Sequence, residues 1–125
     1  MEKENKNILI VEDSATTRAL IRAVVEEMAD FNIVEAGSGF EALKLLPSLS
    51  FNLIITDINM PDINGLELIS FVKNNPRYNH IPLIIVSTER SEEDKKRGMA
   101  LGATAYITKP FKAQELQEVI KQVII

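Results

Sequence analysis

The sequence predicts an α/β fold in which a five-stranded parallel sheet is covered by helices on both faces. Short apolar runs rich in Ile and Val recur along the chain, and each is too short for a helix but long enough for a strand. Helical patterns with recognisable starts lie between these runs, so strands and helices alternate. Five such units with short, right-handed connections give a doubly wound parallel sheet. The 125 residues are expected to form one domain, 1–125.

Three of the predicted strands are central and two lie at the edges. The continuous apolar runs 8–11, 53–56 and 83–86 indicate strands that are buried on both faces. Segments 32–36 and 105–108 mix polar and apolar residues, as expected for less completely covered edge strands. The resulting strand order is 2-1-3-4-5, the flavodoxin-like (βα)5 arrangement, in which ligands bind beyond the carboxyl ends of the strands.

Capping residues mark four helix starts. Ser14 precedes the first helix, and three later pairs have capping-box or similar spacing: Ser38 with Glu41, Asn64 with Glu67, and Ser91 with Asp94. Two helices carry apolar stripes that should pack on the sheet, formed by Leu20, Ile21, Val24, Val25 and Met28 in the first and by Leu116, Val119, Ile120, Val123 and Ile124 in the last. The helix at 91–101 has few apolar residues, and Gly98 weakens its interior, so we expect it to be the most loosely held.

Composition argues against several classes of function. The net charge of −4 and the lack of a basic run argue against direct nucleic-acid binding. There is no cysteine, so neither disulfides nor thiolate metal sites hold the fold, which is compatible with a reducing compartment. The polar start at 1–7 lacks a signal-peptide core, and no apolar stretch approaches the ~20 residues that span a bilayer. We therefore expect a cytoplasmic protein without membrane insertion.

Acidic residues and one lysine are predicted to meet at the carboxyl edge of the sheet. Glu12 and Asp13 follow the first central strand, Asp57 ends the second, Ser87 follows the third and Lys109 comes after the last strand. Three carboxylates against one ammonium resist full ionisation unless a cation joins them. Oxygen ligands without His or Cys suit Mg²⁺, which often completes its shell with water and a phosphate group.

Three motifs at these strand ends resemble the receiver domains of two-component response regulators, and in particular the CheY-like chemotaxis receivers. The motifs are Val-Glu-Asp-Ser at 11–14, Asp-Ile-Asn-Met-Pro at 57–61 and Lys-Pro-Phe at 109–111, and the similarity covers nearly the whole chain. The resemblance implies a signalling switch rather than an enzyme, with self-catalysed phosphoryl transfer from a sensor histidine kinase and autodephosphorylation. It implies Asp57 as the phosphoacceptor, with Ser87 and Lys109 contacting the phosphoryl oxygens. It also implies that Mg²⁺ is held by Glu12, Asp13, Asp57 and the backbone carbonyl of Asn59.

The same resemblance implies how the signal would be switched and read. Movement of Ser87 toward the phosphoryl group would leave space for Tyr106, biasing the surface of the fourth helix, fifth strand and fifth helix that contacts a downstream protein. Asn59 and Glu89 would tune the rate of dephosphorylation. The Lys109–Pro110 bond is expected to be cis. Tyr106 has an equally good interpretation as a static edge residue.

Several residues have simpler interpretations. Thr88 stands where many relatives have a small alanine, which affects access to the site. His80 has no ligand partner at metal-binding spacing and is expected on the surface. The basic run 95–97 is either a docking patch or a set of cations that favours a helix C-terminus, with neither preferred.

Three other functions compete with the receiver interpretation. A phosphohydrolase of the haloacid dehalogenase type needs a second Asp where Asn59 stands, and a flavin-binding loop would be repelled by Glu12 and Asp13. A phosphorylation-independent adaptor with the same fold would not need the acidic pair, acceptor, hydroxyl and lysine together. For the target, a flagellar motor switch is the first candidate, and a phosphorelay or another signalling complex is the second.

Overall fold

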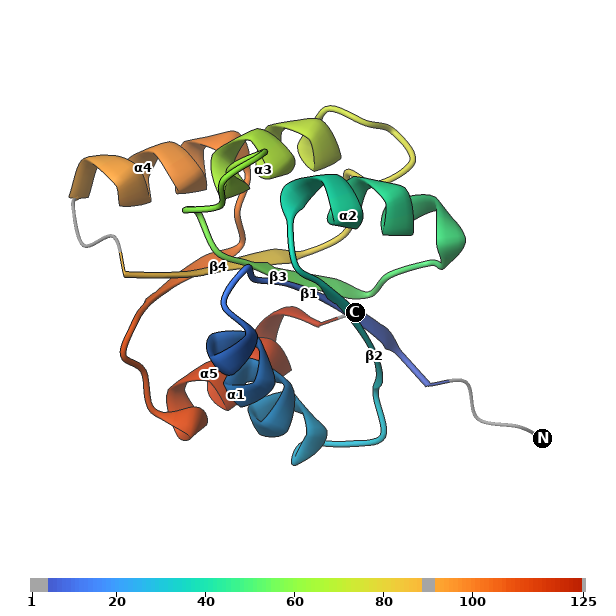
Figure 1. Ribbon diagram of the computed structural model, residues 1–125, viewed down its shortest axis with the longest axis vertical. Coiled ribbons are helices and arrows are strands. Elements are labelled where there is room, and N and C mark those ends of the chain that lie inside the picture. The colour runs from blue at the N-terminus through green and yellow to red at the C-terminus, as the bar shows by residue number, and fades with distance from the viewer. Residues whose placement is uncertain (1–4, 89–91, 125) are drawn as a thin grey trace.

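The computed structural model describes residues 5–88 and 92–124, which form one five-stranded sheet with helices on both faces (Figure 1). The strands are β1 (Asn7–Val11), β2 (Asn32–Ala36), β3 (Leu53–Thr56), β4 (Leu83–Ser87) and β5 (Ala105–Thr108). They pair in parallel in the order β2-β1-β3-β4-β5. The predicted fold class and strand order are confirmed. The predicted strand bounds agree with the observed ones to within one residue. The two differences are that β1 starts at Asn7 and that β4 continues to Ser87.

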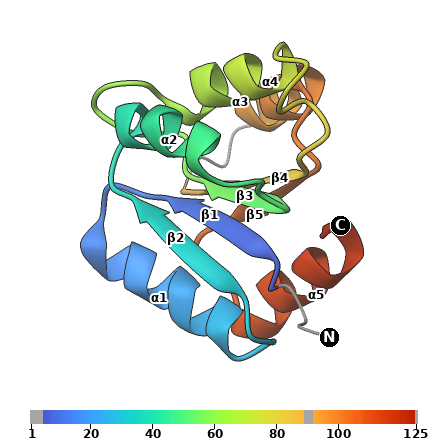
Figure 2. The same ribbon diagram turned by 90° about the vertical axis from the view of Figure 1, so that its right-hand side faces the viewer.

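The helices are α1 (Ala15–Glu26), α2 (Gly39–Leu45), α3 (Gly65–Lys73), α4 (Glu92–Leu101) and α5 (Ala113–Val123), and a short 3₁₀ helix at Leu46–Ser48 follows α2. Figures 1 and 2 show α1 and α5 on one face of the sheet and α2, α3 and α4 on the other. Within the described residues, none of these helices is both long and apolar enough to cross a membrane.

Side-chain caps start three of these helices where the sequence predicts them. The side chain of Ser14 accepts the Thr17 N–H, and that of Ser38 accepts the Glu41 N–H. Asn64 and Glu67 form a complete capping box on α3, in which each side chain accepts a backbone N–H of the other. These bonds satisfy N–H groups that have no partner within the helix. The fourth predicted cap, Ser91, lies outside the described residues.

Strand alternation divides the core into two layers. Ile8 and Ile10 of β1 belong to the cluster under α1 and α5, while Leu9 and Val11 belong to the cluster under α2, α3 and α4. Every residue of β3 and β4 is buried, whereas β2 and β5 are partly exposed. The assignment of central and edge strands is therefore confirmed, and both faces of the central strands are covered by helices.

Two features of the helices differ from the sequence-based expectation. Leu20 was expected on the packed stripe of α1, and this is wrong, because it is 54% exposed. It lies one residue, about 100° around the helix, before Ile21, at the margin of the face that packs on the sheet. Gly98, expected only to weaken α4, is the one described residue of that helix that is buried, and a Cβ there would lie 2.5 Å from Cδ1 of Ile85. The glycine thus lets α4 approach β4 closely.

Candidate functional site

Backbone pairing continues beyond the strands and brings the predicted site residues to one edge of the sheet. The Glu12 N–H donates to the Ala36 carbonyl at 3.0 Å, and the Asp57 N–H donates to the Val11 carbonyl at 3.1 Å. On the other side, the Lys109 N–H donates to the Ser87 carbonyl at 2.8 Å. Each residue is fixed by a strand neighbour, so their convergence follows from the strand order.

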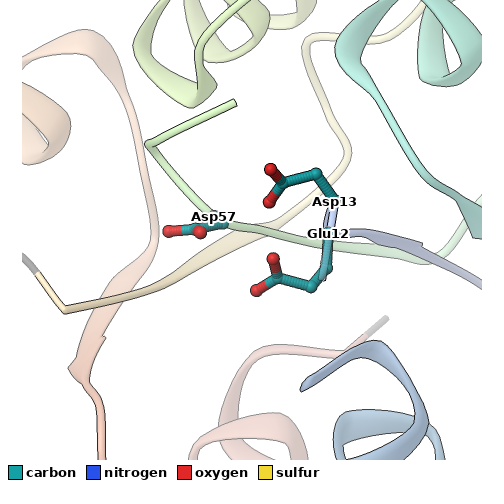
Figure 3. A group of neighbouring side chains, drawn as sticks. All are labelled: Glu12, Asp13 and Asp57. Carbon is teal, nitrogen blue, oxygen red and sulfur yellow. The ribbon is translucent and has the colours of Figure 1, made fainter. Parts of the chain in front are cut away.

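Three carboxylates share this edge. One oxygen from each of Glu12, Asp13 and Asp57 lies within 4.8 Å of the others. Figure 3 shows all three carboxyl groups directed to the same side, with Asp13 above and Glu12 below the end of β1 in this view. Glu12 is 1% exposed and Asp57 8% exposed, whereas Asp13 is open to solvent. The cluster therefore combines two buried acids with one accessible acid.

Lys109 provides the positive charge in the cluster. Its Nζ donates to Oε1 of Glu12 at 2.6 Å and to Oδ2 of Asp57 at 3.4 Å. The Lys109 side chain is only 15% exposed, so both interactions are largely shielded from water. The peptide bond to Pro110 is cis, as predicted.

The environment of Glu12 shifts the pKa of its carboxyl group upward. Burial of the carboxylate raises the pKa of Glu12, and the neighbouring charge of Asp57 raises it further. Hydrogen bonds from Lys109 and from the Ser14 N–H, which lies 3.1 Å from Oε2, act in the opposite direction. The net pKa is above its ordinary value. A further cation at this edge would therefore stabilise the ionised cluster.

Neighbouring residues hold both the carboxylate and the backbone carbonyl of Asp57 in place. The Ile58 N–H donates to Oδ1 of Asp57 at 2.7 Å, and the Thr56 hydroxyl donates to the Asp57 carbonyl at 3.0 Å. Gly65 approaches from α3, where its N–H donates to the Ile58 carbonyl at 2.8 Å and a Cβ would lie 2.1 Å from the Asp57 carbonyl oxygen. Only a glycine permits this contact without displacing the backbone.

The remaining predicted residues are placed as follows. Ser87 is fully buried at the end of β4, and Tyr106 is half-buried on the adjacent strand β5 and packs against the core. Asn59 and Thr88 are exposed, whereas Glu89 lies outside the described residues. His80 is exposed, as expected. The basic run 95–97 is exposed, and Arg97 pairs weakly with Asp94 at 3.8 Å, which favours neither interpretation of that run.

Sequence reasoning missed a guanidinium beside the acidic pair. Nη1 of Arg18 donates to the Glu12 carbonyl at 2.7 Å, while its Nε pairs with Glu35 of β2 at 3.1 Å. Arg22 also pairs with Glu35, at 2.7 Å. The only signal in the sequence was that Arg18 and Arg22 are four residues apart, which places both on the same face of the first helix. Arg18 thus joins α1 and β2 to the backbone that carries the acidic pair.

An apolar hollow of about 430 Å³ opens beside Lys109. It lies between the start of α1 and the loop that follows β5, and it is lined by Thr17, Leu20, Thr88, Lys109, Pro110 and Phe111. The exposed side chain of Leu20 therefore lines a hollow that lies next to the acidic cluster.

Comparison with known proteins identifies the family. The sequence profile of the response regulator receiver domain matches residues 8–121. The chain belongs to the response regulator receiver family. The receiver is 34% identical to the chemotaxis protein CheY of Pseudomonas aeruginosa over 116 residues, which cover 93% of this chain and 94% of that protein. It is 35% identical to CheY1 of Helicobacter pylori over 118 residues, covering 94% of this chain and 95% of that protein.

A much longer relative and a solved structure extend this result. The receiver is 39% identical to histidine kinase P4 of Formosa agariphila over 123 residues, which cover 98% of this chain but only 9% of the kinase. The structure of the chemotaxis protein CheY4 of Vibrio cholerae superposes with a TM-score of 0.89 at 31% identity, covering 97% of this chain and all of that one. The receiver is thus CheY-like in sequence and fold and belongs to two-component signalling.

Family membership also bears on the competing functions. Receiver domains take phosphoryl groups from histidine kinases, bind Mg²⁺ at an acidic pocket and act on downstream targets. As a family they are signalling switches and are broadly non-enzymatic. The phosphohydrolase and flavin-binding alternatives therefore receive no support, whereas an acidic group of the kind at which receiver domains bind Mg²⁺ is present in this chain.

Proposed function

We propose that this receiver accepts a phosphoryl group on Asp57 from a sensor histidine kinase and changes its affinity for a downstream protein in response. The observation that carries the proposal is the meeting of Asp57 with Glu12, Asp13 and Lys109 at one sheet edge. A carboxylate nucleophile with cations around it is suited to phosphoryl transfer, because catalysis of that reaction is mainly positioning and charge neutralisation.

The donor set fits Mg²⁺. Glu12, Asp13 and Asp57 offer only oxygen ligands, and their spacing within 4.8 Å is close to the ~3–4 Å that separates two oxygens on one Mg²⁺. We assign the backbone carbonyl of Asn59 to the same site, as the resemblance to receiver domains implies. When bound, Mg²⁺ supplies positive charge to the oxygens of the phosphoryl group.

The receiver's own residues orient the acceptor and stabilise the charge that develops. The Ile58 N–H fixes one oxygen of Asp57, so the carboxylate cannot rotate freely toward solvent. Lys109 is held near both Glu12 and Asp57, where its ammonium would also reach a phosphoryl oxygen. We assign Ser87 as a hydroxyl donor to that group, since it ends the strand next to β3.

The readout proposed for the receiver uses the surface of α4, β5 and α5. Ser87 and Tyr106 would move together after phosphorylation, and Asn59 with Glu89 would set the lifetime of the acyl phosphate. The likeness to CheY proteins favours a chemotaxis target, with a phosphorelay or a phosphorylation-independent adaptor as alternatives. The proposal includes one receiver domain over 1–125 and a cytoplasmic location.

The hollow beside Lys109 is the place where we expect the kinase to approach. A phosphohistidine must reach Asp57 from the open side of the cluster, and this hollow shares Lys109 with that cluster. Its apolar lining, with Leu20 54% exposed, suits a helix that carries apolar residues beside the histidine. A small phosphodonor would not need this contact.

Incubation with acetyl phosphate and Mg²⁺, followed by intact mass measurement, tests the proposal. One phosphoryl increment is expected, and it should disappear with EDTA or in Asp57→Asn. The matched control Asp30→Asn changes an exposed acid in the turn after α1 and should leave the increment intact. If the folded protein gains no phosphoryl group from acetyl phosphate or from a phosphohistidine donor, the phosphorylation-independent adaptor becomes the better interpretation.

A further inference from the structure

The loop that follows Asp57 is attached to the first turn of α2. Oδ1 of Asp62 accepts the Gly39 N–H at 3.2 Å, and Oδ2 accepts the Phe40 N–H at 2.9 Å. The hydrogen bond from Phe40 is the main reason why the pKa of Asp62 lies below its ordinary value. A charged carboxylate from a distant loop thus satisfies two of the N–H groups that the start of a helix leaves free.

Close packing joins the same two segments. A Cβ on Gly39 would lie 2.6 Å from the Ile63 carbonyl oxygen and 2.7 Å from the Ile63 Cβ. Since a backbone atom is involved, neither contact can be relieved by rotating a flexible side chain. The start of α2 and the loop are therefore in direct backbone contact, in addition to the hydrogen bonds that Asp62 accepts.

The loop has little freedom at its other positions. Ile58 and Met60 are buried in the core under α2, α3 and α4. At the C-terminal end of the loop, Asn64 and Glu67 form the capping box of α3, and the Gly65 N–H donates a hydrogen bond to the Ile58 carbonyl. Asn59 is exposed between two buried residues, so its position depends on how the segment 58–64 is held.

We propose that Asp62 is a positioning residue that couples the Mg²⁺ site to the surface of α2. By holding segment 58–64 against α2, it fixes Asn59 for its part in binding the cation, and it transmits changes at Asp57 to the first turn of α2. Phe40 lies in that turn and is 59% exposed, so the coupled surface is accessible. This inference rests on the proposed Mg²⁺ site and adds a residue that the resemblance does not assign.

A simple helix cap would behave differently, and the receiver contains one on the same helix. The Ser38 hydroxyl accepts the Glu41 N–H at 3.1 Å and therefore caps α2 through a hydrogen bond within the helix itself. Ser38→Ala removes a cap and weakens α2, whereas Asp62→Ala removes two hydrogen bonds and also releases the loop. Comparing the two variants separates positioning of the loop from stability of the helix.

The experiment is a Mg²⁺ titration of the ¹⁵N-labelled receiver, followed by NMR of its backbone amides. In the unmodified protein, Mg²⁺ should shift the amides of Asp13 and Ile58 together with those of Gly39 and Phe40. Asp62→Ala should raise the Mg²⁺ concentration at half-saturation about 2–30-fold, the range typical of substitutions between coupled sites. In this variant the Gly39 and Phe40 amides should no longer respond, although those of Asp13 and Ile58 still do.

Matched variants complete the test. Ser38→Ala should keep the half-saturation concentration and the response of Gly39 and Phe40. Asp62→Asn retains a side-chain oxygen and should lie between the unmodified protein and Asp62→Ala. Gly39→Ala, which pushes α2 away from the loop, should weaken Mg²⁺ binding in the same direction as Asp62→Ala.

Each outcome has a distinct meaning. If Mg²⁺ shifts no amide near Asp57 in the unmodified protein, the proposed cation site is wrong and the coupling is wrong with it. If the unmodified protein binds Mg²⁺ but Asp62→Ala matches Ser38→Ala in affinity and in amide response, Asp62 is only a cap. That second result would overturn the coupling and leave the Mg²⁺ site intact.

Discussion

Replacing Lys109 by methionine tests how the buried acidic cluster is held in the folded protein. Lys109 Nζ lies 2.6 Å from Glu12 and 3.4 Å from Asp57, and Glu12 is almost completely buried. Methionine keeps most of the aliphatic side chain but removes the ammonium. Glu12 then loses its charged partner and stays close to the like charge of Asp57.

The expected loss of stability can be worked out from this geometry. Removing one partner of a buried ion pair typically costs about 3–5 kcal/mol. Because the Lys109 side chain is 15% exposed, we expect the lower end of that range, about 3 kcal/mol at neutral pH. For a domain of this size, a loss of about 3 kcal/mol lowers Tm by about 10 °C.

The loss should depend on pH in one direction. Burial already raises the pKa of Glu12 above its unfolded-state value of 4.5, and Lys109→Met removes a hydrogen bond that lowers it. The folded variant therefore binds the Glu12 proton more tightly than the unfolded chain does, so its stability falls as pH rises above about 4.5. Below that pH the difference from the unmodified protein should shrink to about 1 kcal/mol, the contribution of one ordinary hydrogen bond.

Urea unfolding in EDTA at several pH values measures this dependence. Glu12→Gln in the Lys109→Met background removes the unpaired charge and should restore most of the lost free energy of unfolding. Lys121→Met is the control, because its side chain is 64% exposed and its ion pair with Glu118 is long, so the change should stay within about 0.5 kcal/mol. A loss that is the same at all pH values, or that Glu12→Gln does not relieve, would refute the reasoning.

Three further substitutions have defined outcomes. Gly65→Ala would place a methyl group 2.1 Å from the Asp57 carbonyl oxygen and should lower the free energy of unfolding by about 2–3 kcal/mol and slow phosphorylation, measured by urea unfolding and intact mass. Lys73→Met removes the ammonium that donates to the Ile81 carbonyl at 2.6 Å and should cost about 1–2 kcal/mol in urea unfolding. Leu20→Glu should slow transfer from a phosphorylated kinase at least about fivefold while leaving phosphorylation by acetyl phosphate unchanged.

Each of these variants has a matched control. A Cβ on Gly37 would meet nothing closer than 3.5 Å, so Gly37→Ala should fold and react normally. Lys44→Met changes an exposed lysine and should leave stability within about 0.5 kcal/mol. Leu49→Glu changes an exposed leucine that lines a different hollow, which shares no residue with the one beside Lys109. It should therefore not affect transfer from the kinase. Equal effects of a variant and its control would contradict the corresponding assignment.

The elements that local sequence determines were predicted well. Runs of Ile and Val defined the central strands, because strands covered on both faces must be continuously apolar. Ser14, Ser38 and Asn64 marked helix starts, because a cap is a contact within a few residues. The convergence of the acidic residues followed once the strand order was known, since parallel strands end at the same edge.

Features that depend on how distant segments meet were not predicted. The exposure of Leu20 depends on the rotation of α1 against the sheet, which spacing alone does not specify to within one residue. The close contacts of Gly98 with Ile85 and of Gly65 with the backbone of Asp57 depend on how each helix packs against the sheet, which the sequence pattern does not specify. Asp62 caps a helix 22 residues earlier in the chain, so a search for capping residues next to α2 could not find it.

Locating the phosphoryl group within the chain tests the central claim most directly. After reaction with acetyl phosphate and Mg²⁺, borohydride reduces an acyl phosphate to the corresponding alcohol, which converts a phosphorylated aspartate to homoserine. Peptide mass spectrometry should then find homoserine at position 57 and unmodified aspartate at position 13. Homoserine at position 13, or a phosphoryl increment that survives in Asp57→Asn, would contradict the assignment of Asp57 as the acceptor.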